Sequence, residues 1–397
     1  MMQSGPAKAE AQADAPNVFT ILGGASMQYD SNVFRLPDDA DTELALGTGQ
    51  RSDWLQEGYV GVEIDKPYAQ QEIQLSASLY KYWYEKFTYL NFTATDFDGS
   101  WQWHLTPHLS GVLTVDRLQQ LNSYADYTNY SQRNVLTTNN YAYSIDWQAV
   151  GGWHPVGKIS ESERRNSALF VEQNSYRAIN GEAGLKYVFR SGNSITGVGQ
   201  QTIGQFLDQA VDEVHFLDTR FKQTGGEMRL STALPEDSAV SGIYGRIGYL
   251  SRNFSHFQER DYSGWIAYGQ ASWNLTSKIH IMLSAGHDIS DYEASYSSYL
   301  TNNNISLTPT WTPTEKIKLH AGYTLSSLHY RGPVVPDSGS RRDIQRSFQM
   351  GADWSPYRSV TISGSFQRQG RDSTYLPTSY QYNDLGGGLT VSVQFGA

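Results

Sequence analysis

Hydrophobic and polar residues alternate along most of this chain. Trp311–Tyr330 gives the plainest example, because Ile317 and Leu319 fall on one side of the alternation while Lys318 and His320 fall on the other. A period of two over about ten residues predicts a β-strand with one apolar and one polar face. Most of the other expected strands repeat the pattern, which indicates a β-sheet with an apolar side and a polar side.

Short turns follow aromatic residues at five places. These are Trp103–Pro107, Trp153–Pro155, Trp273–Thr276, Trp311–Pro313 and Trp354–Pro356. Transmembrane β-barrels carry rings of aromatic residues where the membrane meets water. We therefore expect a membrane girdle at one end of the strands, and its members are Trp103, Trp153, Trp273, Trp311, Trp354 and Phe395.

The spacing of the alternating segments predicts about eighteen strands, with sixteen as an alternative count. The expected fold class is all-β, a transmembrane antiparallel up-and-down β-barrel. The sixth and seventh strands are expected at Asn140–Trp153 and Ser167–Tyr176, with the charged segment Lys158–Arg165 in the connection between them. Because successive strands run in opposite directions, this order of strands places the Pro-containing turns at one end and the long loops at the other, as in known outer-membrane barrels.

Two regions of unequal length make up the expected domain organisation. Residues 1–17 are small, polar and Pro-containing, and we expect a disordered N-terminal tail that remains after signal-peptide removal. Residues 18–397 are expected to form a single outer-membrane barrel domain. The expected location is therefore the bacterial outer membrane.

Composition narrows the function classes. The chain has 397 residues, a formal net charge of −10 and no Cys, which removes thiolate metal sites and haem attachment motifs from consideration. It contains no run of about 18 apolar residues, so transmembrane helices are excluded. It also lacks a run of basic residues, which argues against nucleic acid as a partner. No cofactor is expected.

Strand parity assigns a set of charged residues to the polar interior. The expected lumen-lining residues are Glu63, Glu72, Asp98, Asp116, Asp146, Glu172, Glu182, Lys186, Arg190, Glu227, Arg229, Arg246, Asp288, Lys318, His320 and Asp353. Barrels of 16–18 strands leave an aqueous channel. We expect a water-filled or loop-plugged conduit in which many of these charges pair across neighbouring strands, the alternative being a purely structural polar interior.

Two loops contain candidate ligand-binding residues. Tyr124, Tyr127 and Tyr130 could contact sugar rings, although Tyr is also common in exposed barrel loops. Asp38–Glu43 is acidic and could bind Ca²⁺ through oxygen ligands, but the spacing is not that of an EF-hand and a solvated loop explains it better. No metal is therefore assigned.

Catalytic patterns are weak. His108-Leu109-Ser110 is the one H-x-S sequence, and it falls at an expected short turn rather than at the rim where an outer-membrane phospholipase works. The chain has no G-x-S-x-G or H-E-x-x-H motif, and Asp96 and Asp98 are no more than a carboxylate pair. We expect no enzyme activity.

The segment Leu22–Pro37, LGGASMQYDSNVFRLP, resembles the outer-membrane β-barrels of exopolysaccharide operons, the EpsL-like group of β-barrel porins. Tyr29–Arg35 carries most of this resemblance, whereas the final Gly396-Ala397 departs from the usual terminal aromatic residue of such barrels. The resemblance implies a porin-like exit for a secreted polysaccharide, with a periplasmic polysaccharide-export protein as partner.

Three functions therefore remain open. The first is passive export of a polysaccharide through a conduit embedded in outer-membrane lipid and lipopolysaccharide. The second is a diffusion or uptake porin for oligosaccharides or other small solutes. The third is a structural or adhesive barrel whose loops bind a partner.

Overall fold

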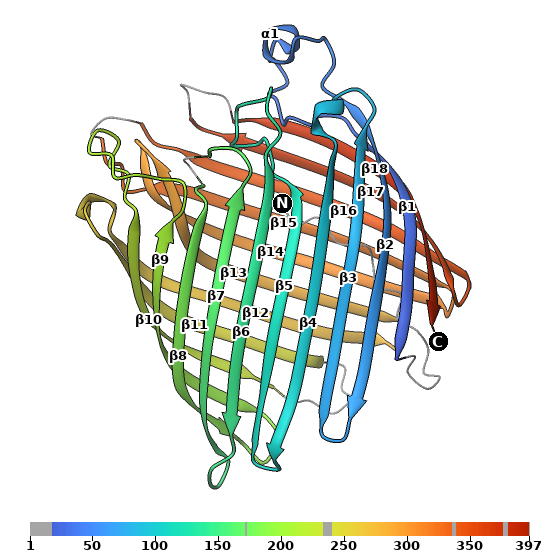
Figure 1. Ribbon diagram of the computed structural model, residues 1–397, viewed down its shortest axis with the longest axis vertical. Coiled ribbons are helices and arrows are strands. Elements are labelled where there is room, and N and C mark those ends of the chain that lie inside the picture. Colours follow the sequence, from blue (N-terminus) through green and yellow to red (C-terminus); the bar gives the residue numbers. More distant parts are fainter. Residues whose placement is uncertain (1–17, 171–172, 233–239, 336–338, 376–379, 397) are drawn as a thin grey trace.

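The computed structural model describes residues 18–170, 173–232, 240–335, 339–375 and 380–396. Eighteen antiparallel strands form one sheet in which each strand pairs with its sequence neighbours. β1 and β18 pair along Thr20–Asp30 and Gly386–Gly396, which closes the sheet into a barrel (Figure 1). Closure matters because an unpaired backbone group in hydrocarbon costs several kcal/mol. The expected fold class is confirmed, with the count of eighteen.

The strands have these bounds: β1 Phe19–Asp30, β2 Asp53–Tyr68, β3 Gln71–Tyr84, β4 Phe92–Thr106, β5 Leu109–Leu121, β6 Val135–Trp147, β7 Trp153–Asn166, β8 Tyr176–Val188, β9 Ser194–Phe206, β10 Arg220–Ser231, β11 Val240–Phe254, β12 Tyr262–Thr276, β13 Ile279–Ala294, β14 Ser297–Thr314, β15 Ile317–Arg331, β16 Arg342–Tyr357, β17 Val360–Ser373 and β18 Tyr382–Gly396. The short helices are α1 Thr42–Leu46, η1 Thr88–Leu90 and η2 Gln258–Arg260. No helix in the described part of the chain is long and apolar enough to span a membrane.

Connection length separates the two ends of the barrel. Only two residues join β2 to β3, β4 to β5, β12 to β13, β14 to β15 and β16 to β17. The opposite end carries most of the longer connections, among them L1 (31–52), L2 (85–91), L3 (122–134), L4 (167–175) and L5 (207–219), together with the two-residue connection between β13 and β14. Figure 1 shows α1 of L1 above one end and the short turns at the other. In outer-membrane barrels, the long loops face outside and the short turns face the periplasm.

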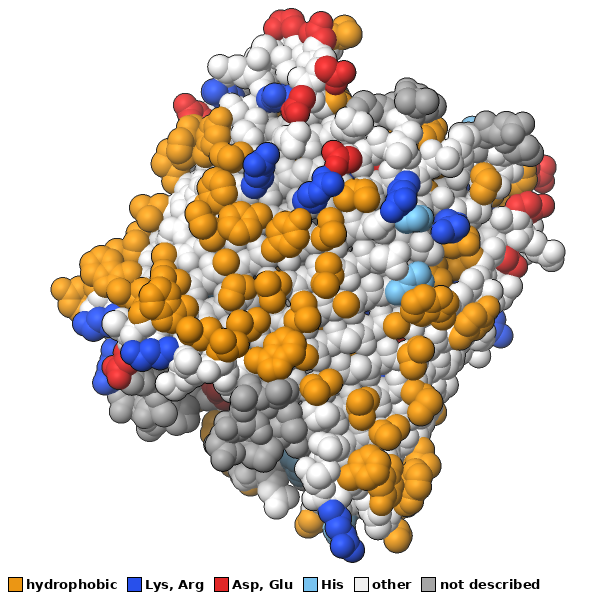
Figure 2. All heavy atoms as spheres, turned by 180° about the vertical axis from the view of Figure 1, so that it is seen from behind, with side chains coloured by type: hydrophobic (Ala, Val, Ile, Leu, Met, Phe, Trp, Pro, Cys, Tyr) orange, Lys and Arg blue, Asp and Glu red, His pale blue; other side chains and the backbone are white. Residues whose placement is uncertain are grey.

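The outer face carries the apolar side of the alternation. Val60, Ile203, Ile247 and Leu389 are each more than half exposed on different strands, and Figure 2 shows a broad band of hydrophobic side chains across the face of the barrel that it draws. Exposing this apolar surface to water would be unfavourable, whereas the acyl chains of a lipid bilayer cover it without that free-energy cost. The fold is therefore that of an outer-membrane barrel.

Two boundaries differ from the sequence prediction. Lys158–Arg165 lies inside β7, and β8 begins only at Tyr176, so the described residues 167–170 and 173–175 belong to the loop L4 rather than to a strand. The turn before β7 occupies residues 148–152, before Trp153, because Gly151 and Gly152 adopt positive φ angles of 59° and 88° that non-glycine residues avoid. The expected tail at residues 1–17 lies outside the described residues.

The end of the β13–β14 hairpin leaves the wall. β12 pairs with β13 only as far as Ala267 and His287, although β12 continues to Tyr262 and pairs there with β11. Beyond this point β13 pairs with β14 alone, up to Ala294 and Ser297. Tyr292, Glu293 and Ser298 are almost fully buried, so other protein segments cover both faces of this hairpin tip.

Candidate transport path

A network of charges spans the interior wall between β8 and β13. Arg229 Nη2 on β10 lies 2.6 Å from Glu182 Oε2 on β8 and also pairs with Glu227. Arg246 on β11 lies 3.7 Å from Glu227 and 3.2 Å from Asp288 on β13. Five of the residues that parity assigned to the lumen are thus brought together. Each arginine lies between two carboxylates, so the network fixes the arrangement of charges on one side of the barrel interior.

Two further sets of interacting charged residues lie near the short-turn end. Asp146 on β6 pairs with Lys186 on β8 and accepts a hydrogen bond from His154 Nδ1 at 2.6 Å. His320 on β15 lies 3.6 Å from Asp353 on β16.

Other expected lumen residues are scattered. Glu63, Glu72, Asp98, Asp116 and Lys318 occupy lumen-side positions on β2, β3, β4, β5 and β15, and Asp116 accepts a hydrogen bond from Asn140. Arg190 is an exception, because β8 ends at Val188 and Arg190 lies exposed in the turn before β9. Glu172 lies outside the described residues.

Loop L3 reaches across the mouth of the barrel. Asp126 at its centre contacts Arg341 Nη2 at 2.7 Å and Arg371 Nη1 at 3.1 Å. Along the wall, β4, β3, β2, β1 and β18 stand between β5, where L3 begins, and β17, which carries Arg371. Contact over that separation requires L3 to fold over the opening. We call Asp126, Arg341, Arg371 and Asp343 the mouth cluster.

Burial makes the mouth cluster a firm attachment. The side chains of Arg341, Arg371 and Asp343 are fully shielded from solvent, and Arg341 Nη2 lies 2.6 Å from Asp343 Oδ2. The guanidinium of Arg341 also stacks 3.6 Å from the ring of Tyr380. Burial raises the pKa of Asp126, but the charges of Arg371 and Arg341 outweigh it, so the pKa lies below the usual aspartate value. Asp126 is therefore ionised at neutral pH.

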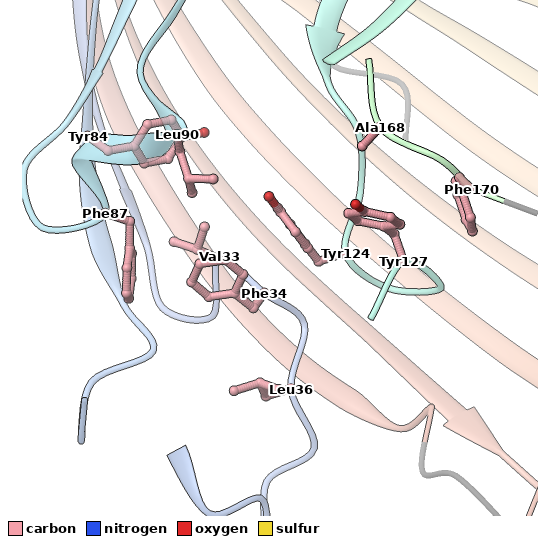
Figure 3. Close-up of a cluster of buried hydrophobic side chains, with 10 residues drawn as sticks. All are labelled: Val33, Phe34, Leu36, Tyr84, Phe87, Leu90, Tyr124, Tyr127, Ala168 and Phe170. Carbon is pink, nitrogen blue, oxygen red and sulfur yellow. The ribbon is translucent and has the colours of Figure 1, made fainter. Parts of the chain in front are cut away.

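An aromatic cluster packs the bases of L1 to L4 together. Its buried members are Val33, Phe34, Leu36, Tyr84, Phe87, Leu90, Tyr124, Tyr127, Ala168 and Phe170. Figure 3 shows Phe34 from L1 lying between Phe87 and Tyr124, with ring centroids 4.7 Å and 4.9 Å away. The cluster holds L3 in the position from which Asp126 reaches the arginines.

The position of L3 does not leave its tyrosines free for the predicted contacts with sugar. Tyr124 and Tyr127 are only 2% and 4% exposed. Their rings pack against Phe34 and Phe170, so their faces are not available to a sugar. Tyr130 is partly exposed, but its ring also packs against Phe34.

The Tyr29–Arg35 signature anchors L1. Asp30 pairs with Arg35 at 2.9 Å, and Arg35 also lies 3.3 Å from Asp384 on β18. Asn32 donates from its amide to the carbonyl of Leu36 and accepts from the Leu36 N–H. These contacts direct Phe34 into the aromatic cluster. The signature thus has a structural task at the join between β1 and β18.

The acidic segment of L1 has structural partners. Asp41 caps α1 by accepting from the Leu44 N–H, and Asp38 lies 3.6 Å from Arg51. Across the described residues, no group of three or more acidic or histidine side chains could hold a metal ion. The girdle aromatics all lie near the short-turn end of their strands, and Trp153, Trp311, Trp354 and Phe395 are about half exposed or more.

A cavity of about 410 Å³ lies on the inner face beneath L4. Its wall includes Arg164 of β7, Asn174 of L4, Phe221 of β10, Arg252 of β11 and Glu293 of the β13–β14 tip. None of these residues is among those that strand parity predicts for the lumen. Strand parity does not tell whether the side chain of Glu293 faces inward or outward, because the hairpin tip leaves the wall. It does not apply to Asn174, because that residue lies in a loop.

Polar atoms in this cavity retain unused hydrogen-bonding capacity. Glu293 is 3% exposed and accepts hydrogen bonds from Asn174 and Gln209 at Oε2, each at 3.1 Å. Among the described residues, no partner reaches Glu293 Oε1 or Arg164 Nε. Arg252 pairs with Asp291 and lies over the ring of Phe221 at 3.9 Å. The cavity wall therefore contains an acceptor and a donor without a protein partner among the described residues, whereas the ring of Phe221 is 3% exposed and is covered by Arg252.

Comparison with known proteins shows the fold rather than a family. No protein-family model matches the chain, and no curated protein matches it. Among solved structures, OpdF (OccK2) of Pseudomonas aeruginosa superimposes with a TM-score of 0.51 at 8% identity, covering 96% of this chain and 98% of that one.

Two further solved structures agree. OpdK of P. aeruginosa, crystallised with vanillate, has a TM-score of 0.50 at 9% identity, covering 95% of this chain and 99% of that one. OccAB3 of Acinetobacter baumannii has the same TM-score at 8% identity, with the same coverage. OpdK is described as an outer-membrane protein. The chain is an eighteen-stranded outer-membrane β-barrel whose mouth is narrowed by its own loops.

Proposed function

We propose that this barrel is a selective diffusion channel for small polar solutes. The observation that carries the proposal is the fold of L3 over the mouth, where buried ion pairs join Asp126 to Arg341 and Arg371. A mouth narrowed in this way suits molecules of one or two rings better than a polymer. OpdK, which has this fold, was crystallised with the small molecule vanillate.

The cavity beneath L4 is the recognition site in this proposal. Its volume of about 410 Å³ is at the small end of the range for ligand pockets. Arg164 can donate to an oxygen of the solute and Glu293 can accept from a hydroxyl or amine. Weak contacts of this kind permit entry and release, which conduction requires.

A solute-size series tests the proposed function. Liposomes that contain the folded protein should swell in monosaccharides and small hydroxy acids, and should swell little in long oligosaccharides, because the L3 attachment limits the opening. Protein-free liposomes give the baseline. Equal rates for small sugars and for long polymers would contradict the proposal, as would swelling no faster than the baseline.

Substitutions in the cavity should weaken recognition. Arg164→Gln removes a charged hydrogen-bonding group, and Glu293→Gln removes a buried carboxyl group. A hydrogen bond to a charged group contributes about 1.5–3 kcal/mol, so the affinity of the Arg164→Gln variant for a transported solute should fall at least about tenfold. The measurement is solute-induced current block across a panel of monosaccharides, hydroxy acids and amino acids. Asp98→Asn, on the lumen wall outside the cavity, is the matched control. An unchanged block in both cavity variants would remove the cavity from the path.

Export of a polysaccharide, with a periplasmic export protein, is the second candidate. The resemblance at Leu22–Pro37 favours it, although the contacts of Asp30, Asn32 and Arg35 give that segment a role in anchoring L1. Passage of a polymer would require the mouth cluster to open. Deletion of the gene separates the candidates: loss of surface polymer would support export, and loss of growth on a small solute would support uptake.

A further inference from the structure

A group of arginines projects outward from β15, β16 and β17 at the long-loop end. Arg331, Arg342, Arg346 and Arg368 are all exposed. Arg342 and Arg346 share their face of β16 with Phe348 and Met350, which belong to the apolar outer surface. Arg368 pairs in register with Phe348, so the arginines begin at the upper edge of the apolar band. Figure 2 shows Lys and Arg side chains in a row between that band and the long-loop end.

Strand register brings these side chains together in pairs. His329 lies opposite Arg342, which makes Arg331 and Arg342 diagonal neighbours. Arg346 lies opposite Gly370, which likewise makes Arg346 and Arg368 diagonal neighbours. Diagonal positions on adjacent strands are about 7–8 Å apart, within the reach of two guanidinium groups that bind one multivalent anion.

Positive charge on this face is largely uncompensated. Among the described residues of β15–β17, Asp372 is the one carboxylate on the outer face, and it pairs with Arg346. The outer face of β7 and β8 differs, because Arg165 pairs with Glu163 and Arg177 pairs with Glu161, each at 2.7 Å. The chain as a whole carries a net charge of −10, so an unbalanced group of four arginines is a local feature of one side of the barrel.

We propose that this arginine group binds the phosphate groups of lipopolysaccharide in the outer leaflet. The long-loop end faces outside, which places the arginines at the level of the lipid head groups rather than in hydrocarbon. Planar guanidinium groups match phosphate oxygens in charge and in bidentate geometry. Arg331, Arg342 and Arg368 provide three such groups beside the apolar surface that contacts the acyl chains. This inference does not depend on what the lumen carries.

The test compares lipid binding by two sets of variants in the full-length barrel. Arg331→Gln, Arg342→Gln and Arg368→Gln are combined in one protein, and Arg165→Gln with Arg177→Gln forms the control. Binding of bisphosphorylated lipid A and of dephosphorylated lipid A is measured in detergent. Heat-modifiable migration on gels verifies that every variant is folded. Because each arginine near a charged membrane surface contributes about 1 kcal/mol, the triple variant should lose at least about tenfold in affinity for the phosphorylated lipid.

Two further results are expected. The control should keep the affinity of the unaltered barrel to within a factor of about two, since its arginines are already paired with carboxylates. Dephosphorylated lipid A should bind the unaltered barrel as weakly as phosphorylated lipid A binds the triple variant. Equal affinity of the unaltered barrel and the folded triple variant for bisphosphorylated lipid A would overturn the proposal, and so would undiminished binding of the dephosphorylated lipid.

Discussion

Replacing Asp126 by asparagine should open the mouth of the barrel. The substitution keeps the shape of the side chain but removes the charge that two buried arginines share. Breaking a buried ion pair by removing one partner costs about 3–5 kcal/mol, which weakens the attachment of L3 at Asp126 even though Tyr124 and Tyr127 are packed in the aromatic cluster. We therefore expect L3 to detach, single-channel conductance to rise, and trypsin to cleave faster after Arg133 in the same loop.

Asp38→Asn provides the matched control for this experiment. Asp38 also lies in a long loop and contacts an arginine, Arg51, at 3.6 Å, but both side chains are substantially exposed. Exposed pairs contribute about 0–1 kcal/mol, so neither conductance nor cleavage should change. If Asp126→Asn left both measurements equal to those of the control, L3 would not be held by the mouth cluster.

Placing an arginine in the middle of the outer face should destabilise the folded barrel. Ile247 lies at the centre of β11 and is 59% exposed on the apolar surface. An arginine that faces lipid near the bilayer midplane costs about 2–4 kcal/mol. Ile247→Arg should therefore lower the free energy of unfolding by this amount, measured by urea or guanidinium titration in lipid vesicles.

A lumen-facing control distinguishes the effect of placing a charge in lipid from the effect of introducing a larger side chain. Gln200 lies at the centre of β9, opposite Glu182 on β8. An arginine at this position would meet water and a carboxylate, so Gln200→Arg should change the unfolding free energy by less than about 1 kcal/mol. Similar losses in the two variants would show that the outer face does not contact hydrocarbon as the alternation implies.

Periodicity predicted most of the barrel, because lipid on one side and water on the other impose a repeat of two. It placed Glu182, Glu227, Arg229, Arg246 and Asp288 on one face, where they form a single network. The alternation of hydrophobic and polar residues did not predict β7 correctly, because this strand carries polar residues on both faces near its end. Glu161, Glu163 and Arg165 extend β7 with outward charges, so the segment resembled a connection rather than a strand.

The candidate site was harder to predict because its contacts are distant in sequence. Asp126 meets Arg341 and Arg371 across more than 200 residues, and no local pattern marks which loop folds over the mouth. Glu293 belongs to a hairpin tip that leaves the wall, where strand parity no longer tells inside from outside. Tyr124 and Tyr127 looked like surface residues of a polar loop, but packing of four loops buries them.

Single-channel recording of the unaltered protein in planar bilayers tests the central claim most directly. A closed barrel with a polar lumen and a loop-narrowed mouth should give discrete conductance steps, and the steps should be blocked by small polar solutes and not by long polymers. Folded protein that inserts into the bilayer but gives no conductance would contradict the account, because the interior would then be a sealed structural core.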